Sequence, residues 1–573
     1  MQSILKHWEL RDKIAPEADQ SLTEFPPLLR QLLYNRGHST KETALDYILA
    51  RPAHDTNPLQ IYGIPEAASR LARAIAHQEQ IAVYGDYDVD GVTATALLVQ
   101  FLKSVGANVI GYIPNRFEEG YGLNNDALDQ LKLANVSLVV TVDCGIRSLE
   151  EAEHASEIGL DLIISDHHHP GSSVPSAVAV INPKQETDQY PEKDLSGVGL
   201  AYKLADAVLT TLRNSGNAYA EAVEPINSLD LVALGTVADL APLTGENRTL
   251  VREGLKLIRN PRRQGLMALI GVSGISPARI TAEDIGFILG PRLNAAGRLD
   301  SALAAFDLLI SQEIAKTGLL AQQLDSQNRE RQRITREILE AAETIAIGDD
   351  PDAWLLFAAH ESFNPGVVGL AASRLTDKYY RPAVIAHRGE DFTRGSCRSI
   401  PEFHITEALD RCGELLEHHG GHAAAAGFTI KNENLPDFVE RLKQIAADQL
   451  SPIDLRPRMI ADQELSFSEI GPDILPYLEM LQPTGNGNPK AVFVTRDLRV
   501  VNSRPVGKDY AHMKLVLSDG WITYDAIAFR QGHWYGNLPQ RIDAMYTYEV
   551  NEYNGRESLQ LNIRDLKPAG SAD

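Results

Sequence analysis

The stretch VYGDYDVDG, residues 83–91, sets three aspartates directly behind a short apolar run. The run at 81–84 is typical of a buried strand, and the pattern at 92–105 predicts a helix with an apolar face. Asp86, Asp88 and Asp90 therefore occupy the turn between a strand and a helix. In an open parallel sheet, such turns line the carboxyl edge of the strands, where ligands bind.

The same alternation of short apolar strands and helices continues along the chain. It indicates an α/β domain with a mostly parallel sheet that continues to about residue 310. The further predicted strands are 108–113, 136–142 and 160–165, and the predicted helices are 125–134, 149–158, 197–213 and 226–238.

More acidic and imidazole side chains stand at the ends of later elements. Asp143 follows the strand at 136–142, and Asp239 ends the segment ALGTVADL. Asp166, His167 and His168 follow the strand at 160–165. Because the carboxyl ends of parallel strands share one edge, we expect these groups to converge, and clustered carboxylates repel unless cations neutralise them.

The chemistry of this set indicates which ions would bind. Carboxylates with imidazole and without thiolate favour Mn²⁺ or Mg²⁺ over zinc. Five or six such ligands exceed what one ion takes from a protein when substrate must also bind. The sequence therefore predicts two ions roughly 4 Å apart, an arrangement suited to in-line attack on phosphorus.

Two simpler interpretations compete with a metal site. A single aspartate after a strand is more often a turn or a helix cap, as for Asp143 or Asp239 taken alone. DYDVDG also matches the first six positions of an EF-hand loop. That loop requires a glutamate six residues after its glycine, where this chain has Leu97 inside an apolar helix, so the EF-hand is excluded.

The remaining chain shows a long helix, a second α/β unit and a strand-rich end. Residues 319–347 contain neither Gly nor Pro and predict a connecting helix of roughly 40 Å. Alternating runs after 455 predict a small antiparallel barrel, with PTGNGNP at 483–489 as the loop leading into it. The expected parts are an N-terminal helical segment (1–60), a first α/β lobe (61–315), the connecting helix (316–347), a second α/β lobe (348–454) and the barrel (455–573).

Composition excludes several protein classes. The 573 residues include 44% hydrophobic residues with a mean hydropathy of −0.19, which excludes disordered, collagenous and membrane-spanning chains. The first residues lack the apolar core of a signal peptide. Three cysteines (Cys144, Cys397, Cys412) without a CxxC pair fit a reducing cytoplasm, so we expect a cytoplasmic protein without membrane contact.

The net charge of −23 by itself argues against nucleic-acid binding. Residues 455–573 hold 13 basic and 15 acidic residues, so they are nearly neutral and leave room for a basic groove. The six clustered aspartates contribute to the negative charge, and two divalent cations would restore part of it. Net charge therefore does not exclude a nucleic-acid partner held in a cleft.

Together, DYDVDG, DCG, DHH and GTVAD resemble the DHH phosphoesterase superfamily and, within it, the bacterial single-strand-specific exonucleases of the RecJ family. The resemblance extends from about residue 50 to 570. It implies a DHH domain, a DHH-associated domain and an OB-type barrel. It also implies that Asp166 orients its neighbours and that His168 faces the substrate phosphate or a metal-bound water. The implied ligands of two cations are Asp88, Asp90, Asp143, His167 and Asp239, with Asp86 beside them.

The second lobe and the loops carry further matches to this family. In GGHAAAAGF, residues 420–428, paired glycines would let backbone amides approach phosphate while His422 donates a hydrogen bond. An Ala-rich helix start is the simpler interpretation of that run, and each arginine below would more often lie on an ordinary surface. The substrate-binding residues that the resemblance implies are Arg116, Tyr121, Arg298, Ser396, Arg398, Gly420 and Gly421, with Ser396, Arg398 and Arg116 at a terminal 5′ phosphate.

The resemblance implies a 5′→3′ exonuclease that degrades single-stranded DNA to 5′-mononucleotides in repair and recombination, with Mn²⁺ or Mg²⁺ and no protein nucleophile. Implied partners are single-stranded DNA, a single-strand binding protein and a RecQ-type helicase, with the enzyme a monomer. One alternative is a DHH phosphoesterase acting on oligoribonucleotides, cyclic dinucleotides or pyrophosphate. Another is a non-catalytic replication scaffold, which predicts missing ligands, whereas every motif position here is filled.

Overall fold

The computed structural model describes residues 6–52, 54–116, 119–120, 122–553 and 556–571. The chain forms two compact units. The larger unit comprises Trp8–Gly297, Ser301–Gln322 and Ile460–Asp573, and the smaller consists chiefly of Arg298–Asp300 and Gln323–Met459. Within the described ranges, no helix combines the length and apolar character needed to span a bilayer.

A five-stranded parallel sheet lies at the centre of the larger unit, in the order β3-β2-β4-β5-β6. The order reverses between β2 and β4, and such a switch point is where open α/β sheets bind ligands. The four predicted strands are present, but the sheet ends at β6, and the chain from Gly197 to Ile310 forms helices. The strands are β2 (Gln80–Gly85), β3 (Asn108–Tyr112), β4 (Leu138–Val142), β5 (Asp161–Ser165) and β6 (Ala179–Ile181).

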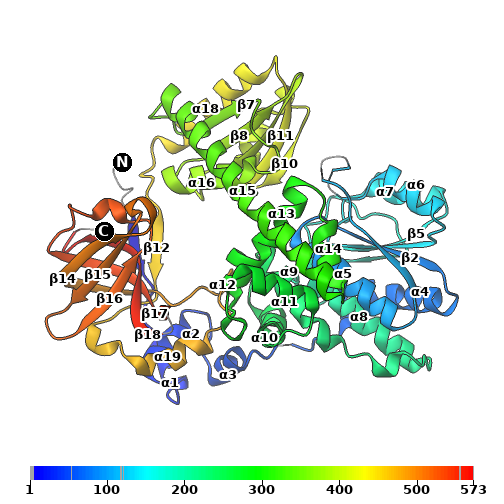
Figure 1. The fold of residues 1–573 in the computed structure, drawn as a ribbon, viewed down its shortest axis with the longest axis horizontal. Coiled ribbons are helices and arrows are strands. Elements are labelled where there is room, and N and C mark those ends of the chain that lie inside the picture. Colours follow the sequence, from blue (N-terminus) through cyan, green and yellow to red (C-terminus); the bar gives the residue numbers. More distant parts are fainter. Residues whose placement is uncertain (1–5, 53, 117–118, 121, 554–555, 572–573) are drawn as a thin grey trace. The chain divides into compact units, whose positions relative to one another are not determined.

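Helices cover both faces of this sheet, which explains why its central strands read as continuous apolar runs (Figure 1). Helices α6 (Asn125–Leu133) and α7 (Leu149–Glu157) share one core with the sheet. Helices α4 (Ile64–Ala76), α5 (Val89–Ser104) and α8 (Gly197–Asn214) pack together against the strands. The later helices include α9 (Leu229–Ala238), α10 (Gly245–Arg259), α11 (Gln264–Ser273), α13 (Gly290–Leu299) and α14 (Leu303–Ile310).

The smaller unit is a mixed sheet in the order β10-β11-β9-β8-β7. Strands β7 (Leu356–His360) and β8 (Ala383–Arg388) run parallel, whereas β9 (Phe392–Arg398), β10 (His418–His422) and β11 (Ala425–Lys431) add antiparallel pairs. Residues 420–428 therefore lie in a β-hairpin, and the interpretation of this run as a helix start is wrong. The β-branched Thr429 and Ile430 that follow the run favour a strand, whereas its glycines and alanines by themselves do not.

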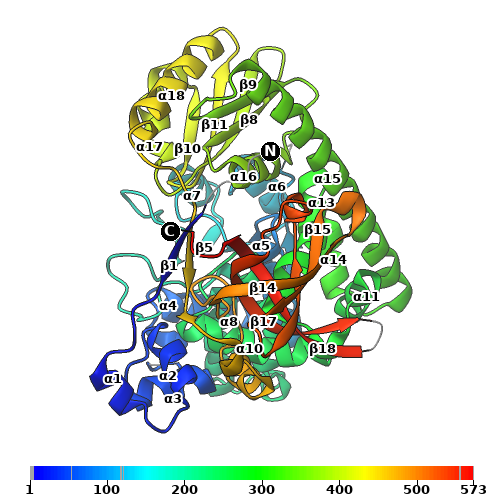
Figure 2. The same ribbon diagram turned by 90° about the vertical axis from the view of Figure 1, so that its left-hand side faces the viewer.

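Both faces of the smaller sheet are covered by helices (Figure 2). Helices α17 (Ile405–Asp410) and α18 (Leu435–Leu450) share a core with one face. Helix α16 (Val368–Tyr379) and the end of α15 (Ile314–Asp349) share a core with the other. The connecting helix α15 has 36 residues, about 54 Å, and extends past both predicted ends, because neither Gly318 nor Gly348 ends it.

The C-terminal strands form a closed barrel, as predicted, with the order β13-β14-β15-β16-β18-β17 and a further β14–β17 pairing. The expectation of a purely antiparallel barrel is wrong, because β16 and β18 run parallel, as do β13 and β14. The strands are β13 (Gln463–Glu464), β14 (Phe493–Val506), β15 (His512–Ser518), β16 (Thr523–Ala528), β17 (Arg541–Tyr553) and β18 (Arg556–Pro568).

The N-terminal helices share a hydrophobic core with the barrel. Helices α1 (Pro16–Ser21), α2 (Pro27–Tyr34) and α3 (Lys41–Leu49) follow a short unpredicted strand, β1 (His7–Leu10). Leu29, Leu32 and Leu33 of α2 are buried in one cluster with Phe467 and Phe493. Figure 1 shows these blue helices beside the orange strands. Segments from opposite ends of the chain therefore depend on each other for burial.

Arg248 of α10 joins three parts of the larger unit. Its side chain donates hydrogen bonds of 2.8–3.2 Å to the carbonyl oxygens of residues 480–483 and of Tyr47. The guanidinium also lies 4.0 Å from the centre of the Tyr47 ring. Arg248 is 2% exposed, and burial lowers its pKa to about 10, so it stays charged at neutral pH. One cation thus holds α3 and the loop leading into the barrel against α10.

We expect Arg248→Leu to lower the free energy of unfolding by about 3–5 kcal/mol, because several buried carbonyl groups would lose their partner. Urea unfolding followed by circular dichroism measures this loss. Arg279→Ala is the control, since its exposed pair with Glu557 contributes about 0.5 kcal/mol or less. A loss for Arg248→Leu as small as that of the control would contradict the anchoring role.

Candidate metal centre

The predicted acidic cluster forms at the carboxyl edge of the parallel sheet. Strands β2 and β4 pair up to Gly85 and Val142, so Asp86 and Asp143 leave the sheet at the same height. The amide of Asp143 donates to Ser165 O at 3.0 Å, which extends the pairing towards Asp166. The edge of the sheet therefore brings together groups that lie far apart in the sequence, as expected.

Backbone amides at two helix N-termini bind Asp88 and Asp90, which follow strand β2. One oxygen of Asp88 caps α5 by accepting hydrogen bonds from Asp90 N at 2.8 Å and Gly91 N at 3.1 Å. Asp90 is fully buried and accepts from Gly197 N at 2.7 Å and Val198 N at 2.9 Å, in the first turn of α8. Amides at a helix N-terminus stabilise anions, so the fold itself offsets part of the charge repulsion. Asp88 therefore caps a helix and also belongs to a group that could hold a cation.

The approach of α8 to the sheet depends on a residue that the sequence did not single out. A Cβ atom added at Gly197 would lie 2.6 Å from Cβ of Asp143 and 2.7 Å from its Oδ1. Real Cβ contacts do not occur at such distances, so any larger residue would displace the helix or the aspartate. GVG after a serine could have suggested a close helix start, but not its contact with Asp143.

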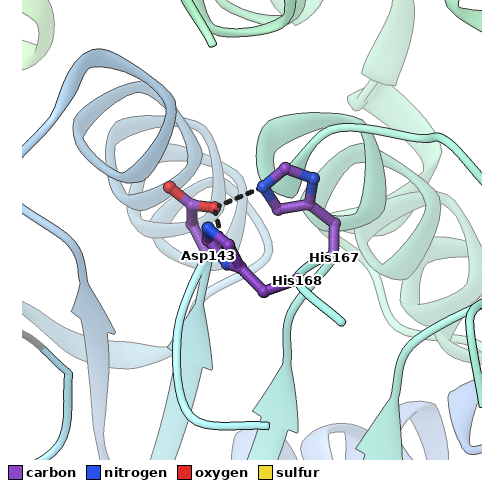
Figure 3. A group of neighbouring side chains, drawn as sticks. All are labelled: Asp143, His167 and His168. Carbon is purple, nitrogen blue, oxygen red and sulfur yellow. Dashed lines mark ion pairs between the residues drawn. The ribbon is translucent and has the colours of Figure 1, made fainter. Parts of the chain in front are cut away.

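His167 faces three carboxylates at once. Its Nε2 atom lies 3.0 Å from Asp143 Oδ1, 3.8 Å from Asp239 Oδ2 and 3.9 Å from Asp90 Oδ2. Figure 3 shows the imidazoles of His167 and His168 both directed at Asp143. Three groups have ligand atoms within 4.8 Å of one another: Asp86, Asp88 and Asp143; Asp90, His167 and Asp239; Asp143, His167 and His168.

The donor atoms fit divalent cations. Among the described residues, Asp86 Oδ1, Asp143 Oδ1 and His167 Nε2 are buried and have no hydrogen-bond partner. A buried polar atom without a partner is destabilising, and a cation would satisfy all three. Asp143 belongs to the group with Asp86 and Asp88, and its Oδ1 lies 3.0 Å from Nε2 of His167, which belongs to the group with Asp90 and Asp239. One carboxylate at this position could serve two ions. The set could hold two Mn²⁺ or Mg²⁺ ions.

The pKa values of the cluster show that its carboxyl groups hold protons when no cation is bound. Burial, followed by the neighbouring carboxylates, raises the pKa values of Asp90 and Asp143 well above their usual range. Burial and Asp88 raise the pKa of Asp239 to about 7. Burial and His168 lower the pKa of His167 to about 3, so its imidazole is neutral, which is the form that binds metals. Bound cations would displace protons from the carboxyl groups.

His168 and Asp166 form a pair beside the cluster. Asp166 accepts hydrogen bonds from Ile146 N at 2.9 Å, from His168 N at 3.1 Å and from His168 Nδ1 at 2.7 Å. Burial alone would lower the pKa of His168, but the bond to Asp166 raises it to about 9. The His168 side chain is 41% exposed. The edge thus presents a protonated imidazole to solvent, held in place by a buried carboxylate.

Asn182 and Lys184 brace this edge, and sequence reasoning missed both. Lys184 Nζ donates to His167 O at 2.7 Å, and Asn182 Nδ2 donates to His168 O at 2.8 Å. The positive charge of Lys184 also acts against the raised pKa of Asp239. Both residues follow β6 in the run AVINPK. Asp143 was identified because polar residues directly after a parallel strand line the ligand-binding edge, and the same reasoning could have identified Asn182 and Lys184.

The other predicted residues of the larger unit are only partly described. The Arg116 guanidinium lies 5.1 Å from the centre of the ring of Tyr87, which is the residue between Asp86 and Asp88. Tyr121 lies outside the described residues. The position of Arg116 beside the turn of the aspartates is compatible with a phosphate contact.

The smaller unit brings its own predicted residues together on one sheet. Across β9, β11 and β10, Arg398 aligns with Ala425 and His422, and Ser396 aligns with Gly427 and Gly420. Each row spans two strand spacings, about 10 Å. A Cβ atom at Gly369 would lie 3.1 Å from Arg398 Nη2, so the first turn of α16 approaches the same place. Gly421 continues β10, and Arg298 Nη1 donates to Gly366 O at 3.5 Å.

The comparisons with known proteins agree with this geometry. Residues 80–236 match the DHH family N-terminal domain, 352–448 the DHHA1 domain and 461–565 the RecJ OB domain. The single-stranded-DNA-specific exonuclease RecJ of Bacillus subtilis is 38% identical over 567 residues, which cover 97% of this chain and 70% of that protein. The chain belongs to the RecJ family.

Solved structures of the RecJ family extend the agreement to the fold. RecJ from Thermus thermophilus in complex with Mn²⁺ superposes with a TM-score of 0.84 at 29% identity, covering 99% of this chain and 80% of that one. The same protein in complex with Mg²⁺ gives a TM-score of 0.77 at 28% identity, covering 99% and 79%. The predicted architecture of DHH domain, DHH-associated domain and OB barrel is therefore confirmed.

We expect Mn²⁺ to bind about tenfold more tightly at about pH 8 than at about pH 6, because it must displace the proton that Asp239 holds with a pKa near 7. A carboxyl pKa raised in the folded state stabilises the metal-free chain at low pH and loses that contribution as pH rises towards 7. The gain in melting temperature on adding Mn²⁺ should therefore grow with pH. Asp239→Asn should reduce this growth, and an equal gain at both pH values would contradict the site.

Proposed function

We propose that this RecJ-family chain is a 5′→3′ exonuclease that degrades single-stranded DNA to 5′-mononucleotides with two Mn²⁺ or Mg²⁺ ions. The observation that carries the proposal is that two ligand groups lie side by side: Asp86 with Asp88 and Asp143, and Asp90 with His167 and Asp239. Asp143 Oδ1 lies only 3.0 Å from His167 Nε2, between the two groups. Such a pair of groups suits in-line displacement at a phosphodiester. A relative named as a single-stranded-DNA-specific exonuclease, 38% identical over 97% of this chain, supports the substrate class.

The residues of the cluster have different roles in the proposed reaction. The bound ions would activate water and neutralise charge on the phosphate. Asp143 is the shared ligand, and Asp86, Asp88, Asp90, His167 and Asp239 complete the set. Asp166 keeps the imidazole of His168 protonated and oriented, so that His168 can donate a hydrogen bond to a phosphate oxygen as charge develops.

The barrel supports a polymeric, single-stranded substrate. Large aromatic side chains that usually fill a barrel core are exposed here: Trp521 is 95% exposed and Tyr510 is 71% exposed, and Phe529 and Tyr535 are about half exposed. Exposed rings stack on unpaired bases without sequence preference. Exposed rings on a barrel suit a polymer better than a dinucleotide, so the alternative substrates are less well supported.

The smaller unit supports the 5′ polarity. Ser396, Arg398 and the first turn of α16 present a hydroxyl, a guanidinium and amide groups that suit a terminal phosphate dianion. His422 and the paired glycines Gly420 and Gly421 lie on the same sheet and would contact the phosphate backbone. We assign Arg116, Arg298 and Tyr121 to contacts with the strand on the family resemblance.

Partners and location extend this proposal. A single-strand binding protein would deliver the substrate, and a RecQ-type helicase would expose it from duplex DNA. We propose that the enzyme acts as a monomer in the cytoplasm, in DNA repair and recombination. Co-purification and sedimentation with each partner test these assignments separately from the activity.

Digestion of end-labelled DNA tests the function. With Mn²⁺, a 5′-labelled single strand should release labelled mononucleotide at once, a 3′-labelled strand should shorten progressively, and blunt duplex should persist. Asp143→Ala should reduce the rate at least about 1000-fold, because the carboxylate that lies between the two ligand groups is lost, while the circular dichroism spectrum stays unchanged. Release from the 3′ end first, or full activity of Asp143→Ala, would overturn the proposal.

Arg398→Ala should reduce the preference for 5′-phosphorylated over 5′-hydroxyl strands by about tenfold or more, since a charge-assisted contact with the terminal phosphate is lost. The ratio of kcat/KM for the two strands measures the preference. Arg441→Ala is a matched control, because Arg441 pairs with Glu414 on the exposed surface of α18. An unchanged ratio in Arg398→Ala would remove this residue from the 5′ site.

A further inference from the structure

The residue after Asp239 has an unusual backbone. Helix α9 ends at Ala238, Asp239 is its C-cap, and Leu240 adopts φ = 63°. Hydrogen bonds from Leu240 N to Val237 O and from Ala241 N to Thr236 O close the helix at 3.2 Å each. Glycine is the usual residue at such a closing position, because a side chain there meets the following carbonyl group.

The leucine side chain has no role in the core. Leu240 is 67% exposed, so it buries little apolar surface in the fold. An exposed leucine alone is ordinary. At a left-handed position, however, glycine or asparagine would close the helix with less strain, so the fold does not explain the choice of leucine.

The loop leading into the barrel holds Leu240 in place. Asn486 Nδ2 donates to Leu240 O at 2.6 Å, and Leu243 N donates to Asn486 O at 2.8 Å. Gly485 and Asn488 bond to each other across the turn of this loop. The PTGNGNP run thus fixes the backbone one residue beyond a predicted metal ligand.

We propose that Leu240 contacts the sugar and base of the nucleotide whose phosphate is held at the metal centre, and that Asn486 is the positioning residue for this contact. The inference rests on the proposed function. Asp239 directs its carboxylate towards His167, while the next side chain lies in solvent. An exposed aliphatic group there can bury the apolar face of a sugar or base, and it does so without reading sequence.

Kinetics of Leu240→Ala and Leu240→Gly on a long 5′-phosphorylated single strand test the contact. We expect KM to rise about tenfold, the effect of losing one leucine contact, with kcat within about twofold of the unaltered chain. Mn²⁺ affinity from titration calorimetry should stay unchanged, and the melting temperature of Leu240→Gly should not fall, since glycine suits the left-handed backbone. Leu133→Ala, at an 84% exposed leucine ending α6, should change none of these.

Asn486→Ala tests the positioning role. It should raise KM by a similar factor, and the double variant with Leu240→Gly should show no further rise, because both changes remove one contact. An unchanged KM in Leu240→Gly, or a rise matched by lost Mn²⁺ affinity, would overturn the contact with substrate. Additive effects would overturn the role of Asn486. An unaltered chain that fails to degrade single strands would instead refute the proposed function itself.

Discussion

The mutual repulsion of buried carboxylates constrains this structure more than any other interaction. Asp86, Asp90 and Asp143 are almost fully buried at one edge of a sheet, where their charges cannot be screened by water. The chain offsets part of the repulsion with the first turn of α8, which donates two amides to Asp90. The remainder is left for divalent cations, so the metal-free protein holds protons that the ions would replace.

Segments of the fold that offer no ligand atom also help to position the buried carboxylates. Helix α8 reaches the aspartates only because Gly197 leaves room for Asp143. Asp239 comes from the end of α9, and the residues after it are hydrogen bonded to the loop that leads into the barrel. Arg248 fixes the other side of that loop through the carbonyl oxygens of 480–483. The barrel is thus connected to the edge of the sheet by polar contacts as well as by the chain.

In the proposed function, each unit recognises a different part of the substrate. The larger unit holds the carboxylates and imidazoles that could bind cations and several exposed aromatic rings on its barrel, which suit a phosphodiester and unpaired bases. The smaller unit holds Ser396 and Arg398 on one strand of a sheet and His422 two strands away, which suit a phosphate at the end of a chain. Neither unit alone accounts for an enzyme that starts at an end, and the proposed polarity depends on both.

The sequence by itself determined four of the five strands of the parallel sheet and the acidic and imidazole groups at their ends. Both follow from local rules: an apolar run forms a buried strand, and polar residues behind it reach the carboxyl edge, as Asp86, Asp143 and His167 do. Only the tertiary structure decided that Asp90 meets α8, 107 residues away, that Leu29 and its neighbours on α2 complete the barrel core, and that β16 runs parallel to β18. These contacts join segments far apart in the chain, and no local pattern of residues encodes which distant segment will bury a given surface.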